Sequence, residues 1–190
     1  MSLSAKMRKP VEPAGSARWE IASFWDGRPL PAGERATVRA GFVDGAFRVE
    51  VDAPYGGDPA PSTPPGPTPR LWEHEVVELF VLGEADQYTE IELGPHGHHL
   101  VLRLAGRRQI VAEGLPLRYE SRVADGRFYG MAWLDLGLLP PGPHRANACA
   151  IRGVGDARRY MSAWPMPGEG PDFHRLERFE PVDFGLGEEP

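Results

Sequence analysis

Cysteine and lysine are scarce in this chain of 190 residues, and each shortage excludes a kind of chemistry. The single cysteine, Cys149, has no partner for an internal disulfide. Every cation after Lys9 is an arginine, so we do not expect a Walker-type phosphate loop, a Schiff base or a Ser–Lys nucleophile pair. The sequence also contains neither a Gly-x-Ser-x-Gly elbow nor a dinucleotide-binding fingerprint.

Long apolar runs and a basic excess are missing as well. No run of about 18 apolar residues occurs, and no signal-peptide core follows Met1. Together with the single cysteine, this predicts a cytoplasmic protein with no membrane partner. The formal net charge is −6, which argues against nucleic acid as a partner because such a protein needs a basic face.

What the chain has in abundance is glycine and proline, 23 and 21 residues, beside 41% hydrophobic residues. That combination favours many short strands joined by turns. Asp44-Gly45 and Asp125-Gly126 each separate two alternating segments, and we predict a β-hairpin at both. We predict strands at 38–42, 47–51, 75–82, 88–93, 98–104, 118–123, 128–134, 146–152 and 158–164.

These strands predict one all-β domain, a two-sheet antiparallel β-sandwich, over residues 19–190. Residues 1–18 show no hydrophobic periodicity and are expected to be a disordered tail. Residues 54–69 hold seven prolines and three glycines, too few backbone donors for a ladder. We expect a long loop there that serves a site beside Trp72.

Glu78 lies in the apolar strand 75–82, on the face of Val76 and Phe80. A carboxylate in that position needs an arginine or several hydrogen-bond donors. We predict a structural buried pair of Glu78 with Arg152, which ends the strand 146–152. The nearby His-Glu-x-x-Glu pattern is not read as a zinc peptidase, because that chemistry needs a helix and Val76-Val77 favours a strand.

His96, His98 and His99 follow a Gly-Pro turn, next to a strand that carries Glu90 and Glu92. A histidine close to a carboxylate can act with it as a general acid–base pair. The histidine spacing matches no closed zinc site, so we predict no metal.

The aromatic residues at strand ends point to a ligand site. Trp72 follows the Pro-rich loop, and Trp164 lies where the last predicted strand ends, ahead of Phe173 and His174. A flat apolar face beside polar side chains is typical of a sugar or small-ligand platform. The candidate ligand-binding residues are Trp72, Glu73, His74, His96, Arg108, Asn147, Trp164, Phe173 and His174.

Several blocks also resemble an uncharacterised family typified by the chromosome 4 open reading frame 33 product, from about Trp25 to Phe184. They are Phe24-Trp25-Asp26-Gly27, Leu71-Trp72-x-x-Glu75-Val76-Val77-Glu78, Tyr88-x-Glu90-Ile91-Glu92-Leu93-x-Pro95-His96-Gly97-x-His99-Leu100-Val101-Leu102, Gly106-Arg107-Arg108, Leu115-Pro116-Leu117 and Pro171-Asp172-Phe173-His174-x-Leu176-Glu177. More distantly, the layout is similar to family 9 carbohydrate-binding modules and DOMON-like sandwiches. That resemblance implies two aromatic residues that clamp a sugar end, Trp72 and either Trp164 or Phe173.

We therefore expect a non-catalytic domain that binds a carbohydrate or similar small hydroxylated ligand and uses no cofactor. One alternative is an enzyme in which His96 or His174 works with Glu90 or Glu92. Another, implied by the DOMON resemblance, is b-type haem binding. Its candidate ligands are His74, His96, His174, Met161 and Met166.

Overall fold

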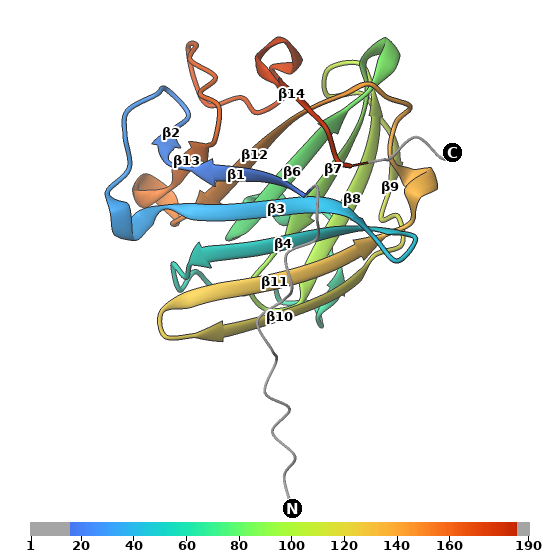
Figure 1. The fold of residues 1–190 in the computed structure, drawn as a ribbon. Helices are drawn as coiled ribbons and strands as arrows, with labels where there is room; N and C mark the ends of the chain where they lie inside the picture. The colour runs from blue at the N-terminus through green and yellow to red at the C-terminus, as the bar shows by residue number, and fades with distance from the viewer. Residues whose placement is uncertain (1–15, 186–190) are drawn as a thin grey trace, which may run out of the picture.

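The structure, a computed structural model, describes residues 16–185 as two β-sheets packed face to face (Figure 1). This confirms the predicted all-β sandwich. The first strand, β1 (Ala17–Ile21), begins inside the range expected to be a tail, because it pairs with β3 (Ala36–Val43). Residues 1–15, the rest of that range, lie outside the described residues.

One sheet has five antiparallel strands in the order β1-β3-β4-β11-β10. Its two hairpins turn at the predicted Asp-Gly pairs, where Asp44 and Gly45 have φ of 50° and 79° and Asp125 and Gly126 have 53° and 70°. Positive φ at both central residues gives a turn whose twist matches the strands. The remaining strands are β4 (Ala46–Pro54), β10 (Arg118–Ala124) and β11 (Arg127–Leu134).

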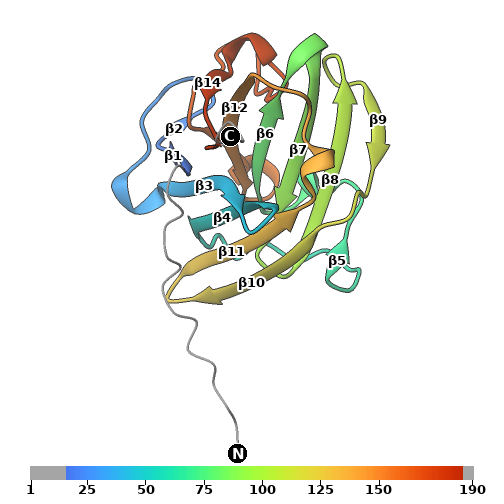
Figure 2. The same cartoon turned by 45° about the vertical axis from the view of Figure 1, so that its right-hand side comes forward.

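The other sheet has nine strands and crosses behind the first at a steep angle (Figures 1 and 2). Its main order is β2-β13-β12-β6-β7-β8-β5, with β14 beside β12 and β9 beside β8. The bounds are β2 (Ser23–Phe24), β5 (Gly66–Pro67), β6 (Val76–Leu82), β7 (Gln87–Leu93), β8 (His98–Ala105), β9 (Ile110–Glu113), β12 (His144–Arg152), β13 (Arg159–Ser162) and β14 (Glu180–Val182).

β5 corrects the expectation that the Pro-rich loop cannot pair. Gly66 and Thr68 donate their N–H groups to Gly97 O and His99 O, at 3.1 and 2.8 Å, in a short parallel ladder with β8. Pro67 lies between these donors, so its missing N–H costs no hydrogen bond. Glu75 holds the start of the loop, because its carboxylate accepts from Gly56 N at 2.5 Å and Asp58 N at 3.3 Å.

The nine-stranded sheet is buried on both faces. Its inner face packs against the five-stranded sheet through residues such as Leu79, Ile91 and Val101. Its outer face carries a second apolar cluster, in which Phe80 contacts Phe173 and Phe179 of the C-terminal segment. All seven residues of β6 are consequently buried, which explains its nearly continuous apolar sequence.

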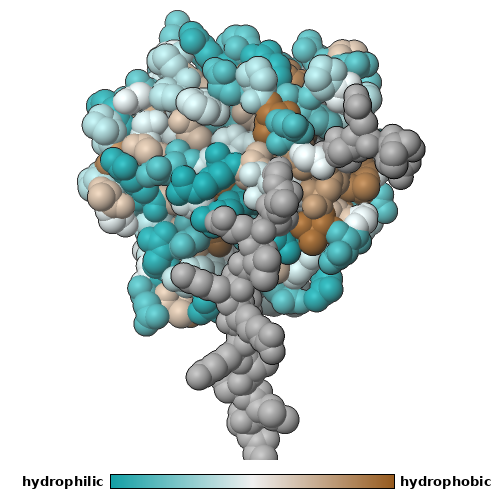
Figure 3. Space-filling model, in the orientation of Figure 1, coloured by the Kyte–Doolittle hydropathy of each residue, from teal (hydrophilic) through white to brown (hydrophobic). Residues whose placement is uncertain are grey.

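The five-stranded sheet, by contrast, is covered on one face only. Buried and partly exposed residues alternate along β4 and β11. In Figure 3, hydrophilic residues accordingly cover most of the face to the left of the grey atoms, and a smaller hydrophobic area lies to their right. Between residues 16 and 185 the only helical turns are six short 3-10 turns. None of the described segments is a helix long and apolar enough to span a membrane.

Candidate ligand-binding site

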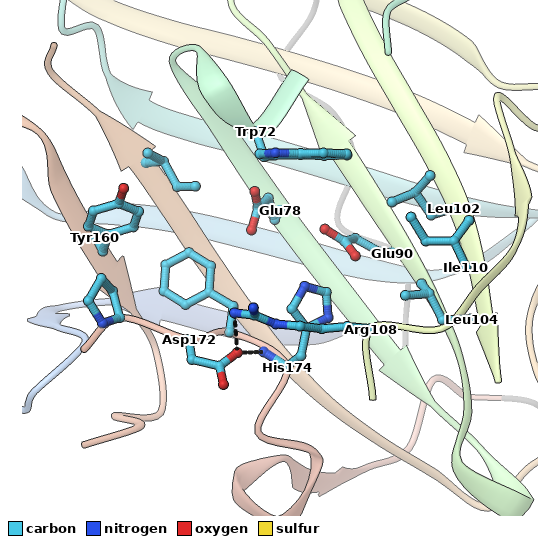
Figure 4. A pocket seen from close by; sticks show the side chains of 13 residues that line it. Trp72, Glu78, Glu90, Leu102, Leu104, Arg108, Ile110, Tyr160, Asp172 and His174 are labelled. Atoms are coloured by element: carbon cyan, nitrogen blue, oxygen red, sulfur yellow. Dashed lines mark hydrogen bonds and ion pairs between the residues drawn. The ribbon is translucent and has the colours of Figure 1, made fainter. Parts of the chain in front are cut away.

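A pocket of about 330 Å³ opens on the outer face of the nine-stranded sheet (Figure 4). Trp72 lies on one side, Arg108, Asp172 and His174 lie on the other, and Glu78 and Glu90 lie between them. The remaining lining residues are Leu102, Leu104, Ile110, Ile151, Tyr160, Pro171 and Phe173.

The floor is built by the register of β6 and β7. Glu78 pairs with Glu92, and Phe80 pairs with Glu90, so the three carboxyl groups occupy neighbouring positions on one sheet face. Glu78 and Glu90 are only 2% and 3% exposed, and both line the pocket. Glu90 Oε2 has no hydrogen-bond partner.

Burial and crowding hold protons on these acids. Desolvation raises the pKa of Glu78 from 4.5 to about 8, although the charge of Arg158 acts to lower it. Desolvation and then the neighbouring Glu78 charge raise the pKa of Glu90 well above 4.5. The pKa of Glu92 is raised for the same reasons, with Glu90 as its strongest like-charged neighbour. The floor can therefore donate as well as accept hydrogen bonds near neutral pH.

The Trp72 wall is a short 3-10 turn, Leu71–Glu73, that Arg158 fastens to β13. The Arg158 guanidinium donates to the carbonyl oxygens of Trp72 and Glu73, the latter at 3.0 Å. Its Nε donates to the Tyr160 hydroxyl at 3.1 Å. One planar cation thus fixes two aromatic sides of the pocket relative to each other.

The opposite wall comes from the loop after β8 and from the C-terminal segment. Asp172 accepts from the guanidinium groups of Arg107 and Arg108, and its Oδ1 accepts from His174 N at 3.1 Å. Desolvation acts to raise the pKa of Asp172, but the hydrogen bonds from Arg107 and His174 N and both arginine charges outweigh it and lower the pKa. Asp172 therefore stays ionised and keeps the Arg108 charge occupied.

A hydrogen-bond chain fixes the protonation of His174. Arg108 N–H donates to the Tyr88 hydroxyl at 3.0 Å, and that hydroxyl lies 2.8 Å from His174 Nδ1. We assign the hydroxyl as the donor to Nδ1, because among the described residues it contacts no other acceptor. Desolvation, followed by the charge of Arg108, lowers the pKa of His174 to about 4. The ring is thus neutral at physiological pH and carries its proton on Nε2.

The structure brings four of the predicted ligand-binding residues together in this pocket: Trp72, Arg108, Phe173 and His174. It places the other five elsewhere. Glu73 pairs with Arg70 on the surface, while His74 and His96 lie at the Pro-rich loop. His96 bonds the Tyr55 hydroxyl at 3.1 Å.

Asn147 and Trp164 interact with each other rather than with the pocket. The fully buried Asn147 amide donates to Trp164 O at 2.9 Å and accepts from Trp164 N at 3.1 Å. These bonds hold the main chain where it leaves β13. The Trp164 side chain is 45% exposed and does not line the pocket. Of the two residues expected as the aromatic partner of Trp72, Trp164 therefore lies outside the pocket and Phe173 lines it.

The expected Glu78–Arg152 pair is wrong, although Glu78 is buried. Arg152 donates to Glu34 Oε2 at 2.7 Å. Along β12 it shares the face of Ala148 and Ala150, which pack in the inner core, whereas Glu78 pairs with Cys149 on the outer face. The two side chains thus lie on opposite faces of one sheet.

The Pro-rich loop does not line the pocket beside Trp72 either. It packs near His74, Glu75 and His98, where His98 Nε2 contacts Thr63 O at 2.9 Å. The loop was expected beside Trp72 because it comes just before this residue in the sequence. The 3-10 turn Leu71–Glu73 instead directs the Trp72 ring into the pocket, away from the loop.

The histidines and methionines considered for haem are also dispersed. Only His174 lines the pocket, whereas Met161 packs in the inner core and Met166 against Asn147. Of the enzyme alternatives, the structure brings His174 and Glu90 into one pocket and leaves His96 outside it. From the sequence, Glu78 is expected to have only a structural role, and no role is expected for Asp172 or Tyr160. The Asp172-Phe173-His174 sequence was the available signal for Asp172.

Comparison with known proteins decides the family. The chain is 41% identical over 182 residues to the UPF0462 protein C4orf33 homolog of Mus musculus, covering 90% of this chain and 94% of the relative. It is 39% identical over 182 residues to the human UPF0462 protein C4orf33, covering 90% and 91%. The chain belongs to the UPF0462 family. No family model matches it.

The UPF0462 fold has a counterpart among solved structures. A Bacteroides uniformis protein, described as a "putative carbohydrate-binding protein", matches 87% of this chain and 84% of its own, with a TM-score of 0.65 and 14% identity. A family 9 carbohydrate-binding module from Caldicellulosiruptor kristjanssonii, in complex with cellotriose, matches 70% and 67% with a TM-score of 0.47 and 15% identity. The first likeness supports the sandwich fold of this UPF0462 chain.

Proposed function

We propose that the pocket binds a small hydroxyl-rich ligand, a carbohydrate or similar polyol, without chemical change. Its volume of about 330 Å³ falls within the range of small-molecule sites. The observation that carries the proposal is the opposition of the Trp72 ring to the Arg108–Asp172 pair across a carboxyl floor. Sugars present an apolar ring face and a rim of hydroxyls, and this arrangement offers a surface for each.

The wider context supports the same function. The floor acids donate or accept hydrogen bonds to hydroxyls, and neutral His174 offers Nε2–H as a further donor. The fold resembles that of a protein described as a "putative carbohydrate-binding protein". A cytoplasmic location remains part of this proposal.

The direct test is a titration of tryptophan fluorescence with a panel of mono- and oligosaccharides. We expect Trp72→Ala to weaken binding about fivefold, because an aromatic stacking face contributes about 1 kcal/mol beyond its buried area. Trp164→Ala is the matched control, since that ring is exposed and outside the pocket. Equal losses in both variants, or no response to any sugar, would contradict the proposal.

A second candidate function is acid–base catalysis on such a ligand. The observation that favours it is the pKa of Glu78, raised to about 8 by burial, beside Glu90 and neutral His174. A carboxyl group protonated at neutral pH can act as a general acid. Incubation with chromogenic glycosides separates the two functions. Turnover that disappears in Glu78→Gln would favour the enzyme, and reversible binding without turnover would favour the binding domain.

A further inference from the structure

Glu78 and Glu90, the two acids of the floor that line the pocket, feel the charges of Arg158 and Arg108 but form an ion pair with neither, unlike several other carboxylates of the described chain. Asp172 pairs with two arginines, Glu34 accepts from Arg152 and Arg159, and Asp52 pairs with Arg127. Over residues 16–185, no ion pair forms with Glu78 or Glu90, although both are almost completely buried. Glu90 Oε2 also lacks any hydrogen-bond partner.

A structural role does not account for this arrangement. Adjacent buried carboxyl groups cost desolvation and mutual repulsion, and apolar side chains at the same positions would pack without that cost. The surroundings are already apolar, with Leu102 and Ile151 beside the acids. Both acids face an open pocket rather than a closed core (Figure 4). The group that would complement them therefore comes from outside.

The other lining residues indicate what kind of group this is. Trp72, Tyr160 and Phe173 are aromatic, and aromatic rings attract cations electrostatically. Arg108 is the guanidinium that lines the pocket, and it is bound to Asp172 at 3.0 Å. In the described part of the chain, no three His, Cys, Asp or Glu side chains are placed to hold a metal ion. An organic ammonium group fits the floor better than a metal.

We propose that the pocket prefers a hydroxylated ligand with a protonated amine, such as an amino sugar, whose ammonium group binds between Glu78 and Glu90. This rests on the proposed function, because the hydroxyls of the same ligand contact the walls. Its positive charge favours the ionised form of these acids, which otherwise hold their protons near neutral pH. The ammonium group also supplies the donors that the unpartnered Glu90 oxygen lacks. The aromatic rings supply further attraction from the sides.

Calorimetry with matched sugar pairs tests this: glucosamine against glucose, and galactosamine against galactose. N-acetylglucosamine keeps the nitrogen but removes its charge. We expect each amine to bind about tenfold more tightly than its parent sugar, and N-acetylglucosamine to show no such advantage. In Glu90→Gln the ratio of the two affinities should fall to about one. Glu120→Gln, on the exposed edge strand β10, should leave the ratio unchanged.

The outcomes separate this inference from the proposed function. Equal affinity for amines and parent sugars would overturn the inference alone, and binding that depends on Trp72 would still support a sugar site. An amine preference that persists in folded Glu90→Gln, with an unchanged circular dichroism spectrum, would also overturn it. If neither hexoses nor hexosamines bind, both the inference and the proposed function fail.

Discussion

Glu78 lies in the floor of the proposed ligand pocket, and its burial without an ion pair also affects the stability of the protein. The sequence places it correctly among apolar residues, and its face of the strand was predicted from alternation alone. The ion-pair partner of Glu78 was not predicted correctly, because an ion pair requires two side chains on the same face of the sheet, and the sequence alone does not show which face each strand presents. Arg152 lies on the inner face and reaches Glu34, so Glu78 remains without an ion pair.

The raised pKa of Glu78 makes stability depend on pH. The folded protein keeps a proton between about 4.5 and 8 that the unfolded chain has lost. The free energy of unfolding therefore falls as pH rises through that range. His174, whose pKa is lowered from 6.5 to about 4, acts in the opposite direction and only below about 6.5. The window from pH 6.5 to 8 thus isolates the floor acids.

We predict that Glu78→Gln raises the melting temperature at pH 8 and flattens its decline from pH 6.5. The gain is on the order of 2–4 kcal/mol, or about 4–16 °C, because Gln keeps the shape without the buried charge. Thermal unfolding at several pH values measures this. Glu120→Gln, exposed on β10, is the control. A variant that melts at the wild-type temperature at pH 8 would contradict the raised pKa.

At the scale of elements, alternation and turn residues predicted the long strands well. The two Asp-Gly hairpins and the strands of both sheet centres lie within a few residues of their predicted positions. The short strands β1, β2, β5, β9 and β14 were missed. They have two to five residues, and neighbouring strands rather than local sequence hold them in place.

Asn147 is another feature that local sequence does not explain. Its position in a small-residue strand suggested a polar contact with a ligand. Instead its amide satisfies both main-chain groups of Trp164 and directs the chain from β13 into the segment that covers the pocket. The contact joins residues 17 positions apart, so only the fold reveals it.

We predict that Asn147→Ala destabilises the protein by about 2–3 kcal/mol, because it leaves two partly buried main-chain groups of Trp164 without their hydrogen-bond partner. The melting temperature should fall by about 4–12 °C. Ser121→Ala, which removes a single hydrogen bond to Pro95 O, should cost less. Similar melting temperatures for the two variants would show that the Asn147 amide is not what fastens this segment.

At the scale of the whole molecule, the pocket exists because the nine-stranded sheet is covered twice. The inner sheet face meets the five-stranded sheet, and the C-terminal segment covers part of the outer face. Trp72, Arg108 and Phe173 are distant in the sequence and converge only after that segment has folded back. Sequence patterns could therefore indicate these residues one by one. The grouping of the floor acids could not be predicted in this way, because it depends on the register between β6 and β7.

Because the nine-stranded sheet is covered on both faces, we predict that its central strands exchange their amide hydrogens more slowly than its edge strands. β6 and β7 have neighbours on both sides and apolar cover on both faces, whereas β9 is an exposed edge strand. We expect peptides from β6 and β7 to exchange slowest and those from β9 far faster. Mass spectrometry of exchanged peptides measures both. Equal protection of β9 and β6 would contradict the layered arrangement.

The C-terminal cover should open separately from the sheet beneath it, because Asp172 fastens it through side-chain contacts with Arg107 and Arg108. We predict that Asp172→Asn accelerates exchange in residues 171–178 and leaves exchange in β6 unchanged. Asp52→Asn removes an ion pair with Arg127 in the other sheet and should leave residues 171–178 unaffected. Faster exchange in β6 to the same extent would mean that cover and sheet unfold as one unit. The pocket would then open only by global unfolding, and a ligand would have to enter through the existing mouth.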